Sequence, residues 1–103
     1  MNSEHLLVVK VPERLLPVER GERYDEPLSE VLEQAGIGFV NGGGTKTTRD
    51  GDIEYCYLDV QVTDLEHGMA LIHSFLRRVG APAATTITEY EPGKFADALT
   101  NDA

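Results

Sequence analysis

Apolar and polar residues group along the chain in patterns that predict several short elements. Leu6–Val11 is an apolar run rich in β-branched residues, and Pro12 follows it directly. We therefore predict a largely buried strand that ends at the proline, which lacks a backbone donor. Residues 12–25 contain two prolines and a glycine among apolar side chains. For this segment we predict an ordered loop with at most one short helical turn.

Two segments carry apolar residues three and four positions apart, the spacing that is typical of an amphipathic helix. The first is expected to begin at Asp25 as its N-cap and to end at Gly36. The second begins at a predicted capping box, residues 63–66, and runs to about Val79. Each segment is therefore predicted to be a helix that buries the apolar stripe along one of its faces.

Residues 37–63 have the pattern of a β-hairpin around Asp50-Gly51. An Asp-Gly pair between strand-like segments is the strongest short-range signal for a hairpin. A two-residue turn predicts these cross-strand pairs: Lys46 with Tyr55, Gly44 with Tyr57, and Gly42 with Asp59. The three glycines at 42–44 also permit a bulge, which would shift the register by one residue and exchange the two faces.

Side chains along the second hairpin arm alternate between two faces of the predicted sheet. We expect the core face to hold Cys56, Leu58, Val60 and Val62, and the other face to hold Tyr55, Tyr57, Asp59 and Gln61. Residues 85–90 predict a final strand, which places Tyr90 beside the tyrosines if Ile87 points inward. The tail at 94–103 is expected either to form one turn that docks Phe95 and Leu99 or to fray.

The predicted order is strand, helix, strand, strand, helix, strand. This order resembles the ferredoxin-like superfold, also called the split βαβ or α/β plait, and small bacterial proteins of uncharacterised function that have this arrangement. No single family is indicated. The resemblance implies an α+β domain with a four-stranded antiparallel sheet and two helices on one face. We predict one such domain over residues 1–93, followed by the C-terminal tail at 94–103.

Composition narrows the classes of partner. The 103 residues include 9 Lys and Arg against 18 Asp and Glu, a formal charge of -9. This acidic balance argues against nucleic acid, because binding to phosphate backbones depends on Lys and Arg. No apolar run reaches the roughly 18–20 residues of a membrane span, and the first five residues lack the basic start of a signal peptide. We therefore expect a cytoplasmic protein with neither nucleic acid nor membrane as its partner.

The sequence offers no convincing catalytic or metal-binding set. Asn41–Thr47 has the composition of a phosphate-binding loop, but a strand follows it where such a loop requires a helix, so we favour a bulge. His67 and His73 are six residues apart on one helix, whereas metal pairs need a separation of four. The single cysteine, Cys56, is expected in the core. We predict no enzyme, no metal site and no other cofactor.

The candidate binding site is the sheet face opposite the helices, where aromatic rings lie beside glycines. Glycine lets another backbone or a flat group approach closely, and tyrosine is common at interfaces. The candidate residues are Tyr55, Tyr57, Gly42, Gly44, Lys46, Asp59 and Tyr90. The alternative is that Tyr57 only covers Gly44 within the chain.

These features favour a non-enzymatic interaction module that binds a protein partner or a second copy of itself through this face. One concrete version is an acidic, immunity-type inhibitor of a basic protein, although the acidic surface also has a simple role in solubility. A first alternative is a small-molecule sensor of the regulatory plait type. A second is a dimeric plait enzyme with His73 or His5 as its base.

Overall fold

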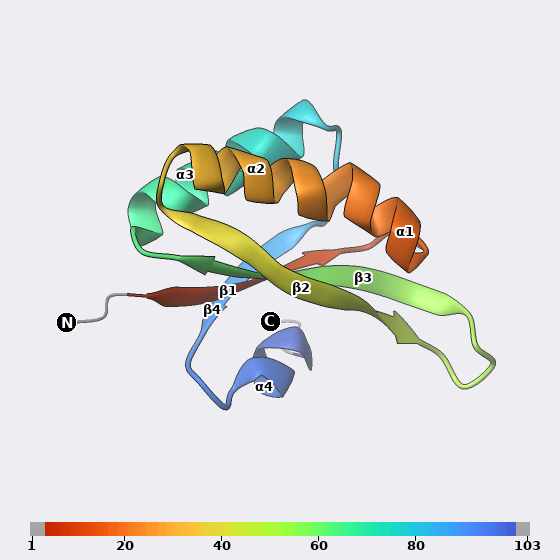
Figure 1. The fold of residues 1–103 in the computed structure, drawn as a ribbon. Coiled ribbons are helices and arrows are strands. Elements are labelled where there is room, and N and C mark those ends of the chain that lie inside the picture. The colour runs from red at the N-terminus through yellow and green to blue at the C-terminus, as the bar shows by residue number, and fades with distance from the viewer. Residues whose placement is uncertain (1–3, 101–103) are drawn as a thin grey trace.

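Four strands form one antiparallel sheet in the order β2-β3-β1-β4 in the computed structural model, which describes residues 4–100 (Figure 1). The strands are β1 (His5–Val11), β2 (Gly38–Thr47), β3 (Ile53–Val62) and β4 (Thr86–Tyr90). The helical segments are α1 (Pro17–Arg20), the π-helical turn η1 (Gly21–Asp25), α2 (Glu26–Gln34), α3 (Leu65–Arg78) and α4 (Phe95–Thr100). The predicted α+β class and the antiparallel four-stranded sheet are confirmed.

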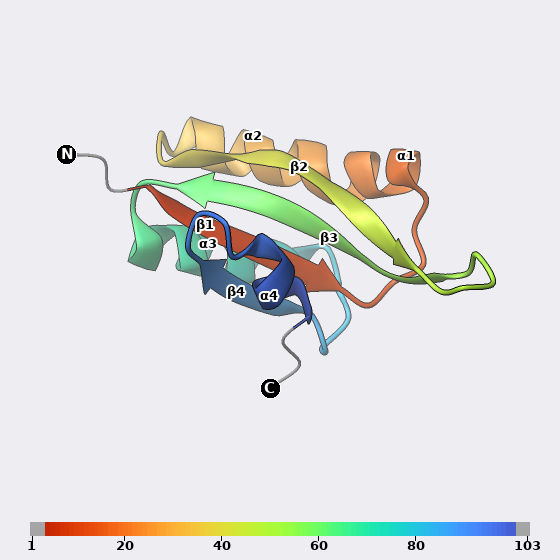
Figure 2. The same cartoon turned by 90° about the horizontal axis from the view of Figure 1, so that it is seen from below.

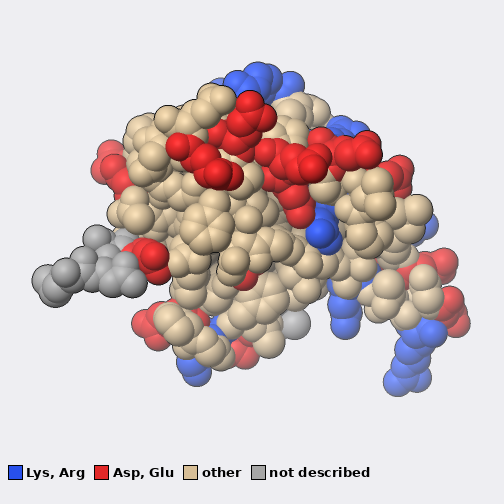
Figure 3. Space-filling view, in the orientation of Figure 1, with Lys and Arg blue, Asp and Glu red and all other residues tan. Residues whose placement is uncertain are grey.

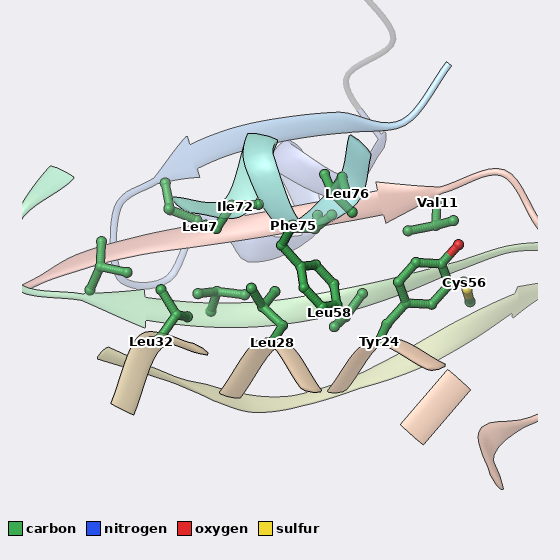
Figure 4. Packing of buried hydrophobic residues seen from close by; sticks show 13 residues of the cluster. Leu7, Val11, Tyr24, Leu28, Leu32, Cys56, Leu58, Ile72, Phe75 and Leu76 are labelled. Carbon is green, nitrogen blue, oxygen red and sulfur yellow. The ribbon is translucent and has the colours of Figure 1, made fainter. Parts of the chain in front are cut away.

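The helices lie on both sides of the sheet. Figure 1 shows α1, α2 and α3 above it and α4 below it, and Figure 2 gives the view from the α4 side. The hydrophobic core lies between the upper helices and the sheet (Figure 4). All four residues predicted for the core face of β3, namely Cys56, Leu58, Val60 and Val62, are fully buried. Burying one large aliphatic side chain contributes about 1.5–3 kcal/mol, so this layer supplies much of the folding free energy.

The loop predicted for residues 12–25 is wrong from residue 17 onward. The chain is helical without interruption through α1, η1 and α2. Pro17 occupies the first turn of α1, where a missing N–H costs no hydrogen bond, and Gly21 adopts ordinary right-handed helical angles. Asp25 stands directly before α2, as predicted, but it does not cap the helix. Its backbone is helical, and its side chain accepts no capping hydrogen bond.

The π-helical turn η1 lies where two residues that disfavour a helix, Gly21 and Pro27, occur in this long helical stretch. A proline inside a helix crowds the carbonyl four residues earlier, and the residue four positions before Pro27 lies in the wider η1 turn, which ends at Asp25. The same turn directs Tyr24 into the core, where its side chain is fully buried beside Leu58 and Cys56 (Figure 4). Burial of this aromatic residue stabilises a segment that local propensity alone assigns to a loop.

The hairpin turn is longer than predicted, but the middle of the two hairpin arms has the predicted register. The Thr48 N–H donates to the Asp52 carbonyl at 2.8 Å, so three residues form the loop, and Gly51 has a φ of 86°. A register shift between Lys46 and Thr47 compensates for the added residue. The pairs Lys46–Tyr55 and Gly44–Tyr57 are therefore confirmed.

The third predicted pair, Gly42 with Asp59, is wrong. Between Val40 and Gly43 the register shifts by one residue, because β2 holds an extra residue there. Gly42 has a φ of 113°, a conformation that side chains of L-residues rarely adopt. The glycine run thus forms the bulge that the sequence favoured.

Helix α3 begins one residue later than its predicted capping box implies. Asp64, not Thr63, is the N-cap, and its carboxylate accepts a hydrogen bond from the His67 N–H at 3.0 Å. Gly36 and Gly80 follow α2 and α3 with positive φ values, as predicted for helix ends.

Candidate functional site

The structure gathers part of the predicted site on the sheet face opposite α2 and α3, which we call the open face. Tyr57 pairs with Gly44, and Asp59 pairs with Val8 of β1, so all four share this face. Tyr90 joins them from β4, because Ile87 pairs with the core residue Val9. Val8 is only 1% exposed although it points away from the main core, because α4 covers this part of the face.

A cluster of three aromatic rings fixes α4 to the sheet. The Phe95 ring centroid lies 5.5 Å from that of Tyr57 and 5.3 Å from that of Tyr90. The first pair is tilted and the second meets edge to face, which are both favourable arrangements of aromatic quadrupoles. The chain's own C-terminal helix therefore occupies the aromatic part of the predicted binding surface.

A hydrogen bond between Tyr90 and Asp59 lies beside this cluster. The Tyr90 hydroxyl donates to Asp59 Oδ1 at 2.5 Å. Burial, together with the hydrogen bond to Asp59 and the negative charge of that carboxylate, raises the pKa of Tyr90 well above its usual value. Tyr90 is thus a neutral donor at physiological pH, and Asp59 has a partner within the fold.

Tyr57 lies directly over Gly44. A Cβ atom added to Gly44 would come within 2.5 Å of the Tyr57 Oη atom and 2.7 Å of Cζ. The glycine therefore makes room for the ring of the opposite strand, which is the cross-strand covering proposed as the alternative to a binding role.

Of the other predicted site residues, Tyr55 and Lys46 lie nearer the hairpin turn, and Gly42 lies in the bulge of β2. Tyr55 is only 9% exposed, with Lys10 Nζ 4.3 Å from its ring centroid. Lys46 pairs with Tyr55 and is exposed. Gly42 is exposed in the bulge, with open space around its Cα. These residues flank the aromatic cluster.

Phe39 is an exposed aromatic residue of the open face that the sequence reasoning missed. It pairs with Gln61 and retains 39% of its accessible surface, although most aromatic side chains are well buried. The signal was present in the sequence, because in a strand Phe39 and its neighbour Val40 must point to opposite faces. Val40 packs against the core, so Phe39 points outward.

A group of polar side chains joins α1 and η1 to the segment that precedes them. Arg20 Nε donates to Asp25 Oδ1 at 3.2 Å, and the Tyr24 hydroxyl donates to Glu13. Burial raises the pKa of Asp25, although its hydrogen bond to Arg20 and the charge of that guanidinium act in the opposite direction. Burial likewise raises the pKa of the Cys56 thiol to about 11, so this thiol is not an activated nucleophile.

The histidines are separated from one another. His67 and His73 are exposed on α3, while His5 Nδ1 lies 2.7 Å from Glu89 Oε2 across β1 and β4. Within residues 4–100, no three His, Cys, Asp or Glu side chains are placed to hold a metal ion. In the same part of the chain, none of the helices combines the length and the apolar character needed to cross a bilayer.

Comparisons of the chain with protein-family models, with curated proteins and with solved structures found no match in any of the three.

Proposed function

We propose that this chain is a ferredoxin-like, non-enzymatic interaction module that binds a protein partner or a second copy through the open face. The strand order β2-β3-β1-β4, with helical connections after β1 and β3, supports the ferredoxin-like assignment. The acidic charge and the scattered titratable groups support a binding role over catalysis.

The observation that carries the proposal is the position of Phe95 between Tyr57 and Tyr90. A single aromatic side chain on a six-residue helix covers this part of the sheet. A helix this short has little stability of its own and depends on its packing. We infer that an aromatic side chain of a partner replaces Phe95 when α4 lifts away, and that the exposed Phe39 extends the contact.

The test uses Phe95→Ala in the full chain, which removes the internal occupant without shortening the protein. We expect the variant to self-associate or to bind a partner protein more tightly than the natural chain does. Light scattering measures the mass over a concentration series, and affinity capture from the source cell measures partner binding. Adding Phe39→Glu is expected to abolish either association.

The matched control is Val18→Ser, since Val18 is 71% exposed but lies on α1, on the other side of the sheet. This variant should retain any association. The proposal is wrong if Phe95→Ala remains folded, stays monomeric and captures no protein that Phe39→Glu releases.

A further inference from the structure

β2 is an edge strand of the sheet, and most of it lacks the charged residues that edge strands usually carry. Its first eight residues, Gly38–Thr45, include no charged side chain. Natural edge strands commonly carry charges, prolines, β-bulges or protective coverings, because their outward N–H and C=O groups otherwise pair with another strand. Of these devices β2 has the bulge between Val40 and Gly43. Gly42 and Gly43 are exposed in this strand and carry no side chain of their own in the way of an approaching backbone, although the Arg20 guanidinium lies beside Gly43 and the Tyr57 ring covers Gly44. The bulge divides the edge into two short stretches, and the uncharged residues on either side of it are the part of β2 that can pair with an added strand.

Part of this edge already has an internal partner. The Val40 N–H donates to Ser29 Oγ of α2 at 3.2 Å, which shows that the Val40 backbone points away from β3. Alternate residues of an edge strand direct their backbone groups outward in this way. Ser29 covers one such group near the start of β2, and the exposed glycines follow farther along the strand.

The helix beside this edge is strongly acidic. Glu26, Glu30 and Glu33 are all exposed on α2, at spacings of four and three residues that place them in one row. Together with Ser29 and Gln34 they line a shallow hollow. Figure 3 shows acidic side chains gathered above a largely uncharged area over β2. Figure 2 shows that α2 runs along the β2 side of the sheet.

This charge distribution decides which strand fits the edge. A second copy that paired through β2 about a two-fold axis would bring one acidic row toward the other, and like charges across an interface are costly. A strand with lysine or arginine on one face would instead place its cations below the acidic row. Alternate strand residues lie about 6.7 Å apart, close to the rise of about 6 Å between helix residues four apart.

We propose that the outer edge of β2 binds an extended basic segment of a partner protein by strand addition, with Glu26, Glu30 and Glu33 pairing with its cations. Main-chain hydrogen bonds to β2 supply the register, and the acidic row selects the charge of the partner. This surface is separate from the open face, because the added strand lies beside the sheet and not on α4.

The test is a titration of the isotope-labelled full chain with blocked eight-residue peptides of alternating lysine and threonine. We expect backbone amide shifts confined to β2 and α2, with binding that weakens as salt increases. A glutamate-for-lysine peptide should not bind. A lysine peptide with N-methyl groups along one edge should also fail, because it cannot form the ladder but keeps its charge.

A paired variant tests the acidic row. Glu30→Gln with Glu33→Gln keeps the shape of α2 and is expected to weaken the lysine peptide about three- to tenfold at low salt. Glu66→Gln, an exposed position on α3, is the control and should leave the affinity unchanged.

Three results would overturn the proposal. The first is the absence of β2 shifts with the lysine peptide. The second is equal binding of the N-methylated peptide, which would reduce the interaction to charge alone. The third is a dimer of the chain with its own β2 edges paired. The open-face interaction is tested separately by Phe95→Ala, because Phe95 lies on α4 and the side chain of Phe39, although it belongs to β2, points to the open face and not to the outer edge.

Discussion

The Tyr90 hydroxyl reaches across β1 to donate a hydrogen bond to the Asp59 carboxylate at 2.5 Å. The two residues belong to β4 and β3, which are not neighbours in the sheet: on β1 between them, Val8 pairs with Asp59 and Leu6 pairs with Tyr90. With Phe95 packed on Tyr90, this bond links three strands to the C-terminal helix. Tyr90 and Asp59 on the open face therefore already have partners within the fold, and α4 covers this part of the face.

Tyr90→Phe should destabilise the fold by about 1–3 kcal/mol, because it leaves a half-buried carboxylate without its donor. Urea unfolding followed by circular dichroism measures the change. Tyr57→Phe is the matched control, since it retains the ring over Gly44 and the Tyr90–Asp59 bond. Equal stability of Tyr90→Phe and the natural chain would show that the bond contributes nothing net.

Gly44→Ala should also destabilise the fold, by about 1–3 kcal/mol, because the new methyl group meets the Tyr57 ring. The cost should shrink when Tyr57→Val is introduced with it, since the clash is then absent. A double-mutant cycle of unfolding free energies measures this coupling. Additive losses would contradict the proposed covering of Gly44 by Tyr57.

Tyr24 and Tyr90 should titrate above the usual tyrosine range in the folded protein. Burial is the largest cause in both, reinforced by the acceptors Glu13 and Asp59. Because the folded pKa lies above the unfolded value of about 10, the folded state holds its protons more tightly. The resulting stabilisation is complete below pH 10 and is lost as pH rises above it.

Unfolding curves between pH 9 and 12 test this. Combining Tyr24→Phe with Tyr90→Phe should flatten the fall in stability over this range. An unchanged pH profile in the double variant would contradict the assignment.

Cys56 should react slowly with a thiol reagent at pH 8 in the native protein. The side chain is fully buried, so the reagent has little access to the sulfur. Its pKa is raised to about 11, so little of the thiol is in the reactive thiolate form at pH 8. Ellman's reagent monitors the rate, and urea should release one fast-reacting thiol per chain. Native reaction as fast as that of a free thiol would mean that the hairpin opens readily.

Most elements were predictable because their signals are local. The alternation in β3 identified its buried side, since one face must be apolar throughout. The glycines after α2 and α3 marked the helix ends, where a left-handed residue is required. By contrast, α1 and η1 were not predicted, because two prolines and a glycine locally favour a loop. The burial of Tyr24, which stabilises these turns, depends on residues far away in the sequence.

The candidate site shows the same division. Sequence placed Tyr57, Asp59 and Tyr90 on one face, because strand alternation fixes direction. It left open whether the tail at 94–103 would dock through Phe95 or fray, and the structure confirms the docking. It did not predict that Phe95 would cover these residues, since the six residues of α4 carry too little pattern to fix where they dock. It also passed over Phe39, whose exposure depends on what neighbouring elements leave uncovered.

The sequence by itself determined the α+β class, the buried face of β3, the middle register of the hairpin and the acidic charge, because each follows from neighbours in the chain or from composition. Only the tertiary structure decided that α4 covers the aromatic face, that Tyr24 converts a loop into a helix, and that α2 sets an acidic row beside the β2 edge. Those contacts join residues far apart in the sequence, and their energies exist only once the chain has folded.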